Sequence, residues 1–266
     1  MRHMITAGID VGSLSTDAVL MRDGDMLSQI IINTGAMART AAERAFELAL
    51  SAAGLRASDI DAVVATGYGR MNVSFADSQV TEISCHGRGS AWLSPGVRTV
   101  IDIGGQDSKA IRIDGRGNVV DFLMNDKCAA GTGRFLEVMA QRLELELGEL
   151  GREDQQATGA AQISSMCTVF AESEVVSLIA QGVPRPEIIR GLHRSIAERT
   201  AGLASRLGLA PEVMMTGGVA KNPGVVRALS EKLGVKIILP QEPQIVGALG
   251  AALIAQYKAP VSPAKR

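Results

Sequence analysis

The sequence predicts an α/β protein built from two similar lobes. Strand-like and helix-like segments alternate along 266 residues, and hydrophobic residues make up 46% of them, enough for a sizeable core. A strand–turn–strand–turn–strand pattern also occurs twice, about 90 residues apart, without a linker between the copies. We therefore expect a first lobe at residues 1–95 plus about 245–258, a second lobe at 96–244, and a loose tail at 259–266.

Each copy contains short apolar strands bounded by glycine and aspartate turns, followed by segments with helical periodicity. In the first copy, the predicted elements are strands at residues 5–10, 18–21, 26–33 and 62–65, and helices at 38–54 and about 84–93. In the second copy and beyond, they are strands at 99–103, 109–113, 119–124, 213–216 and 236–239, and helices at 129–147, 169–181, 186–207, 223–233 and 245–257.

Charge and composition disfavour several classes of partner. The chain has 27 Lys and Arg against 28 Asp and Glu, so bulk charge would not attract nucleic acid or an acidic membrane. Aromatic residues make up only 3%, too few for a surface that stacks bases. The sequence shows no apolar run of the roughly 18–20 residues that span a bilayer, and no secretory signal. We expect a cytoplasmic protein without a membrane or nucleic-acid partner.

The first candidate site lies at the end of the first strand. The strand brings Asp10 to its tip, and Gly12 allows a sharp turn in which backbone N–H groups and hydroxyls can face a phosphate. Asp10 is placed to hold Mg²⁺, although an ordinary β-turn is the alternative interpretation. The candidate nucleotide-binding residues here are Asp10, Gly12, Ser13, Leu14, Ser15 and Thr16.

Two further loops share this design. In the second loop, Gln106 is a candidate to orient a water molecule, or only to cap the turn, and Asp107 is a candidate Mg²⁺ ligand. A third loop joins a strand to a helix whose N-terminus favours an anion. The candidates in these loops are Asp102, Gly104, Gly105, Gln106 and Asp107, and then Gly217, Gly218, Val219, Ala220 and Asn222. The sequence has no GxxxxGK[ST] motif and no complete GxGxxG motif, which disfavours P-loop and Rossmann sites.

The three loops, in this order, resemble those of the actin/Hsp70/sugar-kinase superfamily of ATPases. The resemblance implies two ribonuclease-H-like lobes with ATP or ADP in the cleft between them. One departure concerns Asp17, which stands where relatives often carry a basic residue. We do not expect Asp17 to contact phosphate.

The chain has three cysteines, Cys85, Cys128 and Cys167, too few for a disulfide framework. Cys128 and Cys167 precede predicted helices, where the helix dipole favours the thiolate that binds iron. Buried structural cysteines are the alternative, but the neighbouring residues are Gly, Ser, Thr and charged ones. Two cysteines per chain, doubled by a two-fold axis, would supply the four thiolates of one [4Fe–4S] cluster.

Three segments resemble the activator components of 2-hydroxyacyl-CoA dehydratases, and the resemblance covers about residues 1–258. These segments are VIDIGGQD at 100–107, NDKCAAGTGRFLEVMA at 125–140 and SSMCTVFAESEV at 164–175. The resemblance implies a homodimer with one ATP per subunit and a [4Fe–4S] cluster held by Cys128 and Cys167 of both chains. It implies no ligand role for Cys85, which we interpret as structural.

The same resemblance implies an ATP-driven transfer of one electron from a ferredoxin or flavodoxin to an iron–sulfur dehydratase, which activates that enzyme for radical dehydration. The ATP-binding subunit of a benzoyl-CoA reductase is an alternative, as is a small-molecule kinase or an actin-like assembly module of the same superfamily. His193 lies in no phosphate motif, and we expect it to be a surface or packing residue.

Overall fold

The computed structural model describes residues 3–164 and 167–258. The predicted tail at 259–266 lies outside these residues, as do positions 165 and 166 of the second cysteine segment. The described residues divide into two compact units, which we call unit 1 (residues 3–95, 116–118 and 244–258) and unit 2 (residues 96–115, 119–164 and 167–243).

Unit 1 is built on a mixed sheet with the strand order β3-β2-β1-β4-β5. The first three strands are antiparallel neighbours, whereas β4 runs parallel to β1 and β5 runs parallel to β4. Its strands are β1 (Ile5–Val11), β2 (Ser15–Arg22), β3 (Asp25–Asn33), β4 (Ala62–Thr66) and β5 (Ser78–Gln79). Its helices are α1 (Ala38–Ala53), α2 (Glu82–Leu93) and α8 (Val246–Lys258), with short turns η1 (Ala57–Asp59) and η2 (Arg70–Asn72).

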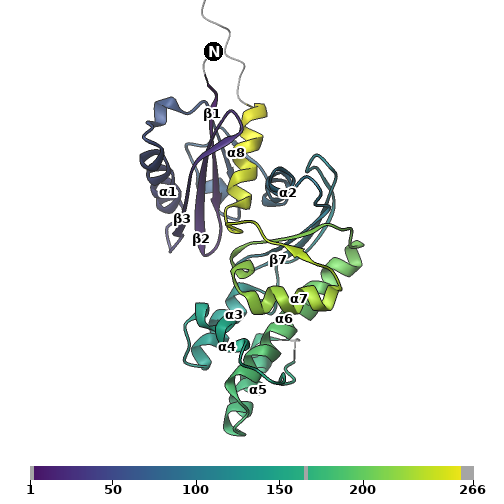
Figure 1. Ribbon diagram of the computed structural model, residues 1–266. Coiled ribbons are helices and arrows are strands. Elements are labelled where there is room, and N and C mark those ends of the chain that lie inside the picture. The colour runs from purple at the N-terminus through teal and green to yellow at the C-terminus, as the bar shows by residue number, and fades with distance from the viewer. Residues whose placement is uncertain (1–2, 165–166, 259–266) are drawn as a thin grey trace, which may run out of the picture. The chain divides into compact units, whose positions relative to one another are not determined.

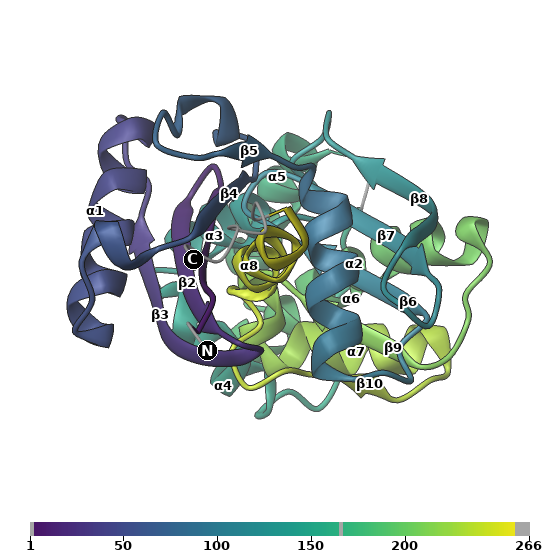
Figure 2. The same ribbon diagram turned by 90° about the horizontal axis from the view of Figure 1, so that it is seen from above.

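Helices cover both faces of this sheet, with α1 on one side and α8 on the other (Figures 1 and 2). The strand β1 serves both faces because successive side chains alternate. Ala7, Ile9 and Val11 pack into the core that includes α1. Thr6 and Gly8 face α8 instead, where Thr6 Oγ1 donates a hydrogen bond of 3.0 Å to the Ala252 carbonyl.

Glycines allow α2 and α8 to pack backbone against backbone. A Cβ on Gly250 of α8 would lie 1.8 Å from the carbonyl oxygen of Cys85 in α2. A Cβ on Gly89 of α2 would lie 2.4 Å from the carbonyl oxygen of Val246. Neither position can accept a side chain unless the two helices move apart.

Unit 2 repeats the same sheet, with the strand order β10-β9-β6-β7-β8. The first three strands in sequence are again antiparallel neighbours, and the next two are parallel additions. Its strands are β6 (Thr99–Ile103), β7 (Ser108–Ile113), β8 (Val119–Asn125), β9 (Val213–Thr216) and β10 (Ile237–Ile238). The repeat predicted from the order of elements is therefore confirmed.

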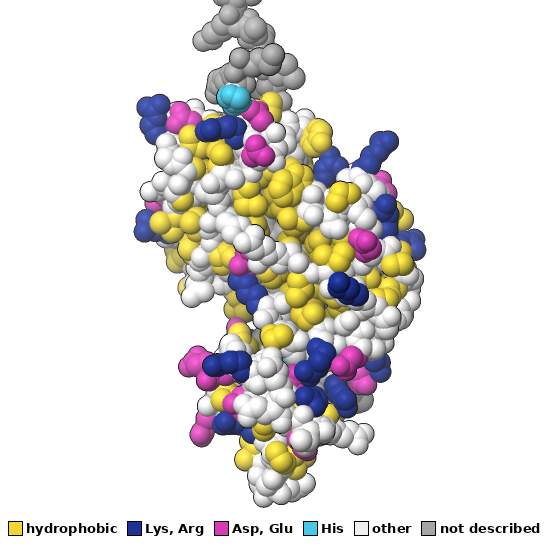
Figure 3. All heavy atoms as spheres, viewed as in Figure 1, with side chains coloured by type: hydrophobic (Ala, Val, Ile, Leu, Met, Phe, Trp, Pro, Cys, Tyr) yellow, Lys and Arg dark blue, Asp and Glu magenta, His cyan; other side chains and the backbone are white. Residues whose placement is uncertain are grey.

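The helices of unit 2 pack on one face of this sheet and on one another. They are α3 (Gly133–Arg142), α4 (Leu150–Asp154), α5 (Thr168–Ala180), α6 (Arg185–Leu207) and α7 (Pro223–Leu233), with short turns η3 (Leu147–Glu149) and η4 (Gly218–Lys221). One core joins the sheet to α3, α6 and α7 through residues such as Ile101, Phe135, Leu192 and Leu229. In Figure 1, α3, α4 and α5 gather at one end of the unit, beyond α6. Basic and acidic side chains intermingle over this region (Figure 3).

The predicted helix at 129–147 is wrong in its extent. Residues 126–132 form an irregular loop in which Gly131 has a φ of +92°, and α3 begins only at Gly133. The helix ends before Glu144, which has a φ of 55° and breaks the helical path. The chain then turns through η3 into α4, neither of which the periodicity predicted. Within the described residues, no helix has the length and apolar character needed to cross a membrane.

A buried ionic cluster joins α4, α6 and α7. Asp154, whose side chain is fully buried, accepts hydrogen bonds from Arg190 Nε at 3.1 Å and from Arg227 at 2.5 Å. His193 Nδ1 lies 3.4 Å from Asp154 Oδ2. Burial alone would raise the pKa of Asp154, but His193 and the two arginines outweigh it and lower the pKa from 3.8 to about 2.

We expect Gly250→Ala to lower the free energy of unfolding by about 1–3 kcal/mol, because the new methyl group must push α2 away from α8. Gly202→Ala is the matched control: this helical glycine of α6 has open space around its Cβ position. That substitution should stabilise the protein by up to about 1 kcal/mol. Urea unfolding measures both. Equal stability of the Gly250→Ala variant and the wild type would contradict tight packing of the two helices.

We expect Asp154→Asn to destabilise the protein at neutral pH by about 2–4 kcal/mol, because two arginines and His193 would face a neutral amide. A carboxyl whose pKa is lower in the folded state stabilises the fold above its unfolded pKa, here 3.8. This contribution disappears as the pH falls towards about 2, the folded pKa. The stability difference from wild type should therefore shrink in acid, as measured by urea unfolding at pH 7 and pH 3. The exposed-site variant Asp25→Asn is the control, and a pH-independent difference would point to packing instead of charge.

Candidate nucleotide loops and cysteine site

The first loop is a tight hairpin between β1 and β2. The Gly12 N–H donates to the Ser15 carbonyl at 2.9 Å, and Ser13 and Leu14 lie at the surface. Thr16 is different, because it is fully buried and its hydroxyl lies 2.9 Å from the Thr34 hydroxyl. Five of the six candidates of this loop therefore lie at the end of β1 or in the hairpin: Asp10, Gly12, Ser13, Leu14 and Ser15. The sixth, Thr16, has its hydroxyl in the protein interior.

Two glycines enclose the carboxylate of Asp10, which is 8% exposed. A Cβ on Gly67 would lie 2.3 Å from Asp10 Oδ1, and a Cβ on Gly247 would lie 2.0 Å from Asp10 Oδ2. The same Cβ on Gly247 would lie 3.2 Å from His86 Nε2. Only glycine leaves room for the acid at these two positions. Sequence reasoning missed Gly67, Gly247 and His86 as neighbours of Asp10.

The second loop repeats this arrangement at the end of β6. Thr216 Oγ1 donates a hydrogen bond of 2.9 Å to Asp102 Oδ1. A Cβ on Gly217 would lie 2.8 Å from the same oxygen. Gly67 and Gly217 each follow a threonine at the end of the parallel neighbour strand, and each has a φ of +84°. The repeated Thr-Gly pair was a signal in the sequence that could have located both positions.

A buried lysine distinguishes the second loop from the first. Lys109 Nζ lies 3.2 Å from Asp102 Oδ2 and 2.7 Å from Asp107 Oδ1, and the lysine side chain is 3% exposed. Lys109 occupies the position opposite Asp102 in the β6–β7 ladder, where the β1–β2 ladder places Asp17 opposite Asp10. The strand-tip acid therefore faces a cation in unit 2 and a second acid in unit 1.

The candidate pair Gln106 and Asp107 lies in the turn between β6 and β7. The Gly104 N–H donates to the Asp107 carbonyl at 3.0 Å, so the backbone itself closes this turn. Gln106 is exposed, whereas Asp107 forms the ion pair with Lys109. A metal ion bound to Asp107 would therefore compete with, or share, the Lys109 contact.

The third loop is fixed at both ends. The Gly217 N–H donates to the Pro243 carbonyl at 2.9 Å, and Val219 and Ala220 are buried in η4. Asn222 caps α7, since its Oδ1 accepts from the Gly224 N–H at 2.9 Å. The capping role leaves Asn222 Nδ2 as the donor to His193 Nε2, 3.1 Å away. His193 is thus a buried, hydrogen-bonded residue that supports the third loop, which sequence reasoning missed.

Cys128 and Cys167 are free thiols that are partly exposed, whereas Cys85 is fully buried in the core of unit 1, as predicted. Cys167 is the N-cap residue of α5, also as predicted. Cys128 is not at a helix start, which corrects our expectation: it lies five residues before Gly133, the first residue of α3. The loop is held instead by Asn125 Nδ2, which donates to the Cys128 carbonyl at 2.8 Å, and by Thr132 Oγ1, which donates to the Ala129 carbonyl at 2.6 Å.

An arginine from α6 contacts the Cys128 sulfur. Arg199 Nη1 lies 3.3 Å from Cys128 Sγ and 3.4 Å from the Ala130 carbonyl. No local sequence pattern indicates this contact, because the two residues are 71 positions apart. Among residues 3–164 and 167–258, no three His, Cys, Asp or Glu side chains are grouped as ligands for a metal ion.

Backbone hydrogen bonds connect the cysteine loop to the second loop. The N–H groups of Gly133 and Arg134 donate to the carbonyls of Gly104 and Gly105, at 2.9 and 2.8 Å. A Cβ on Gly133 would lie 3.2 Å from the Gly104 oxygen and 3.5 Å from Val219 Cγ2 in the third loop. The second loop, the third loop and the start of α3 therefore meet at one glycine.

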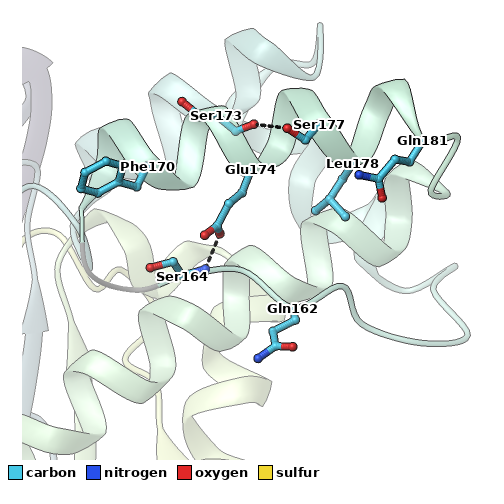
Figure 4. A pocket seen from close by; sticks show the side chains of 8 residues that line it. All are labelled: Gln162, Ser164, Phe170, Ser173, Glu174, Ser177, Leu178 and Gln181. Atoms are coloured by element: carbon cyan, nitrogen blue, oxygen red, sulfur yellow. Dashed lines mark hydrogen bonds between the residues drawn. The ribbon is translucent and has the colours of Figure 1, made fainter.

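The helix that begins at Cys167 is anchored by its acidic residues. Arg142 of α3 pairs with Glu172, and Glu174 accepts a hydrogen bond from the Ser164 N–H. A shallow groove of about 480 Å³ runs along this helix, with Glu174 between Phe170 at one end and Gln181 at the other (Figure 4). Val169 and Phe170, two and three residues after Cys167, are 65% and 63% exposed.

Comparison with known proteins gives clear relatives. The activator of lactoyl-CoA dehydratase from Anaerotignum propionicum is 55% identical over 253 residues, which cover 95% of this chain and 97% of the relative. One of the subunits of benzoyl-CoA reductase from Thauera aromatica is 35% identical over 265 residues, covering 96% of this chain and 94% of the relative.

Solved structures confirm the predicted fold of the actin/Hsp70/sugar-kinase ATPases. The activator of the 2-hydroxyisocaproyl-CoA dehydratase from Clostridium difficile, solved with bound ADPNP, is 46% identical with a TM-score of 0.91, and 96% of each chain is covered. A ROK family glucokinase from Streptomyces griseus has a TM-score of 0.60 at 16% identity, covers 95% of this chain and 99% of its own, and supports the fold alone. Residues 7–255 match the BadF/BadG/BcrA/BcrD ATPase family, and this chain belongs to that family.

Proposed function

We propose that this chain is the ATP-driven electron-transfer activator of a 2-hydroxyacyl-CoA dehydratase. The observation that carries the proposal is the direct hydrogen bonding between an ATPase phosphate loop and a loop that presents a partly exposed, free cysteine. The names of the close relatives support the same activity.

The three glycine-containing loops are the candidates to bind ATP and Mg²⁺. In the first loop, Ser13, Leu14 and Ser15 are accessible to a phosphate, with Asp10 behind them. In the second, Gly104 and Gly105 present backbone to a phosphate, and Gln106 is exposed where it can orient an attacking water. Asp10 and Asp107 are the proposed Mg²⁺ ligands. Gly217 and Gly218 would allow an adenosine group to approach the third loop closely.

The two partly exposed thiols fit a shared iron–sulfur site. Cys128 Sγ accepts a hydrogen bond from the Arg199 guanidinium group, and Cys167 lies at the N-terminus of α5. Two such cysteines per chain match a [4Fe–4S] cluster only in a homodimer. When bound, the cluster supplies a one-electron redox centre. The exposed Val169 and Phe170 beside Cys167 are apolar side chains that a second subunit would cover.

The hydrogen bonds at Gly133 couple the two sites in this proposal. A phosphate that repositions Gly104 and Gly105 also moves the first residues of α3, and with them the Cys128 loop. The movement reaches α5 through the Arg142–Glu172 ion pair. Hydrolysis of ATP to ADP and phosphate would thereby control when one electron, taken from a reduced ferredoxin or flavodoxin, passes to the iron–sulfur dehydratase.

A second candidate function is supported by one of the relatives. The similarity to part of a benzoyl-CoA reductase leaves an acyl-CoA reductase as the alternative electron acceptor. Both candidates use the same loops and cysteines, and both place the protein in the cytoplasm with its soluble partners. Electron transfer to each purified acceptor distinguishes them.

Anaerobically prepared protein should contain about two iron and two sulfide ions per chain, since one four-iron cluster is shared by two subunits. Cys128→Ser should remove both iron and the absorbance near 400 nm. Cys85→Ala is the matched control, and it should retain the iron because Cys85 is buried away from both candidate ligands. Absence of iron in the wild type would leave an ATPase or a kinase of the same fold.

Exchange of ADP for a non-hydrolysable ATP analogue should change the angle between the subunits, as measured by distances between spin labels. Gly133→Val should still bind the analogue but reduce this change, because its side chain would displace the Gly104 carbonyl. Gly148→Val serves as the control, since a Cβ at position 148 has open space around it. An identical angle in both nucleotide states of the wild type would refute the coupling.

A further inference from the structure

Arg199 reaches the Cys128 sulfur from a different part of the fold. It belongs to α6, whose neighbouring residues Ile196, Thr200 and Leu203 are buried in unit 2. The Arg199 side chain therefore extends from a buried helix that is distant in sequence from the cysteine loop.

The methylene groups of Arg199 also pack against the backbone of the cysteine loop. Gly131 has a φ of +92°, and a Cβ there would lie 2.9 Å from Arg199 Cδ and 3.4 Å from Cγ. The glycine backbone thus packs directly against the methylene groups of the arginine. At the end of the stem, Nη1 is shared between Cys128 Sγ at 3.3 Å and the Ala130 carbonyl at 3.4 Å. Contacts at positions 128, 130 and 131, among the described residues, thus hold the Arg199 side chain.

We propose that Arg199 is a positioning residue that donates a hydrogen bond to Cys128 Sγ in the cluster-loaded dimer and raises the reduction potential of the cluster. This inference rests on the proposed function. A cation that donates to a ligating sulfur stabilises the reduced form more than the oxidised form, because reduction adds negative charge beside it. The two-fold axis supplies one such arginine for each Cys128.

Arg199→Met tests the inference, because it keeps a similar stem against Gly131 while removing the charge and the donor. Arg199→Lys keeps the charge with a different donor geometry. The exposed Arg194 of the same helix provides the control, Arg194→Met. Iron and sulfide content, circular dichroism and the midpoint potential from an equilibrium redox titration are measured for each protein under anaerobic conditions.

We expect Arg199→Met to retain about two irons per chain and to shift the potential to a more negative value. A roughly tenfold fall in the reduced-to-oxidised ratio at a fixed potential corresponds to about 59 mV for one electron. Arg199→Lys should recover part of this shift, and Arg194→Met should match the wild type. Loss of iron from Arg199→Met alone, with native circular dichroism, would also support a need for the charge at the sulfur.

Two outcomes would overturn the inference. One is full iron content in Arg199→Met with an unchanged potential. The other is equal loss of iron from both Arg199 variants, which would show that positive charge at the sulfur is not what the site requires. Failure of the proposed function is a separate result. A wild-type protein without iron would overturn both the proposed function and the role of Arg199. A wild-type protein with iron, whose content and potential do not change when Arg199 is replaced, would overturn only the role of Arg199.

Discussion

Two backbone hydrogen bonds, from Gly133 and Arg134 to Gly104 and Gly105, fix the position of the cysteine loop relative to the second loop of unit 2. The first N–H groups of any helix lack partners within that helix. Among the described residues no side chain caps α3, and the carbonyls of Gly104 and Gly105 in the second loop fill this role instead. The start of α3, and therefore the preceding loop with Cys128, has a fixed relation to the phosphate loop. A side chain at Gly133 would disturb that relation.

The two units share one arrangement of residues at the strand tip but differ in the charge of the residue opposite the aspartate. Each places an aspartate at a strand tip, opposite a threonine of the parallel neighbour strand that is followed by a glycine in a left-handed conformation. The residue across the antiparallel ladder is Asp17 in unit 1 and Lys109 in unit 2. The strand-tip acid of unit 1 therefore has a second acid across the ladder, whereas the strand-tip acid of unit 2 has the Lys109 ammonium group 3.2 Å away.

Local patterns sufficed for most elements but not for contacts across the fold. All strands except β5, together with the long helix α6 and the capped helix α7, follow from periodicity. An Asn-Pro pair and a glycine mark the two ends of α7. The start of α3 could not be predicted, because its cap is a distant carbonyl instead of a nearby side chain. The same limit applies to His193 and Arg199. Their roles depend on Asn222 and Cys128, which only the packing of α6 brings near.

The helix α6 and the cysteine loop are hydrogen-bonded to different loops of unit 2. Through His193, α6 is connected to Asn222 at the end of the third loop, whereas the cysteine loop is connected to the second loop through Gly133. Arg199 and Cys128 are the point at which these two connections meet, at a separation of 3.3 Å. A displacement of one nucleotide loop relative to the other by about 1 Å would weaken this hydrogen bond strongly, since such bonds have a narrow range of distances. In the proposed activator, a nucleotide that shifts one of these loops would thereby change the electrostatic environment of the Cys128 sulfur through the Arg199 contact.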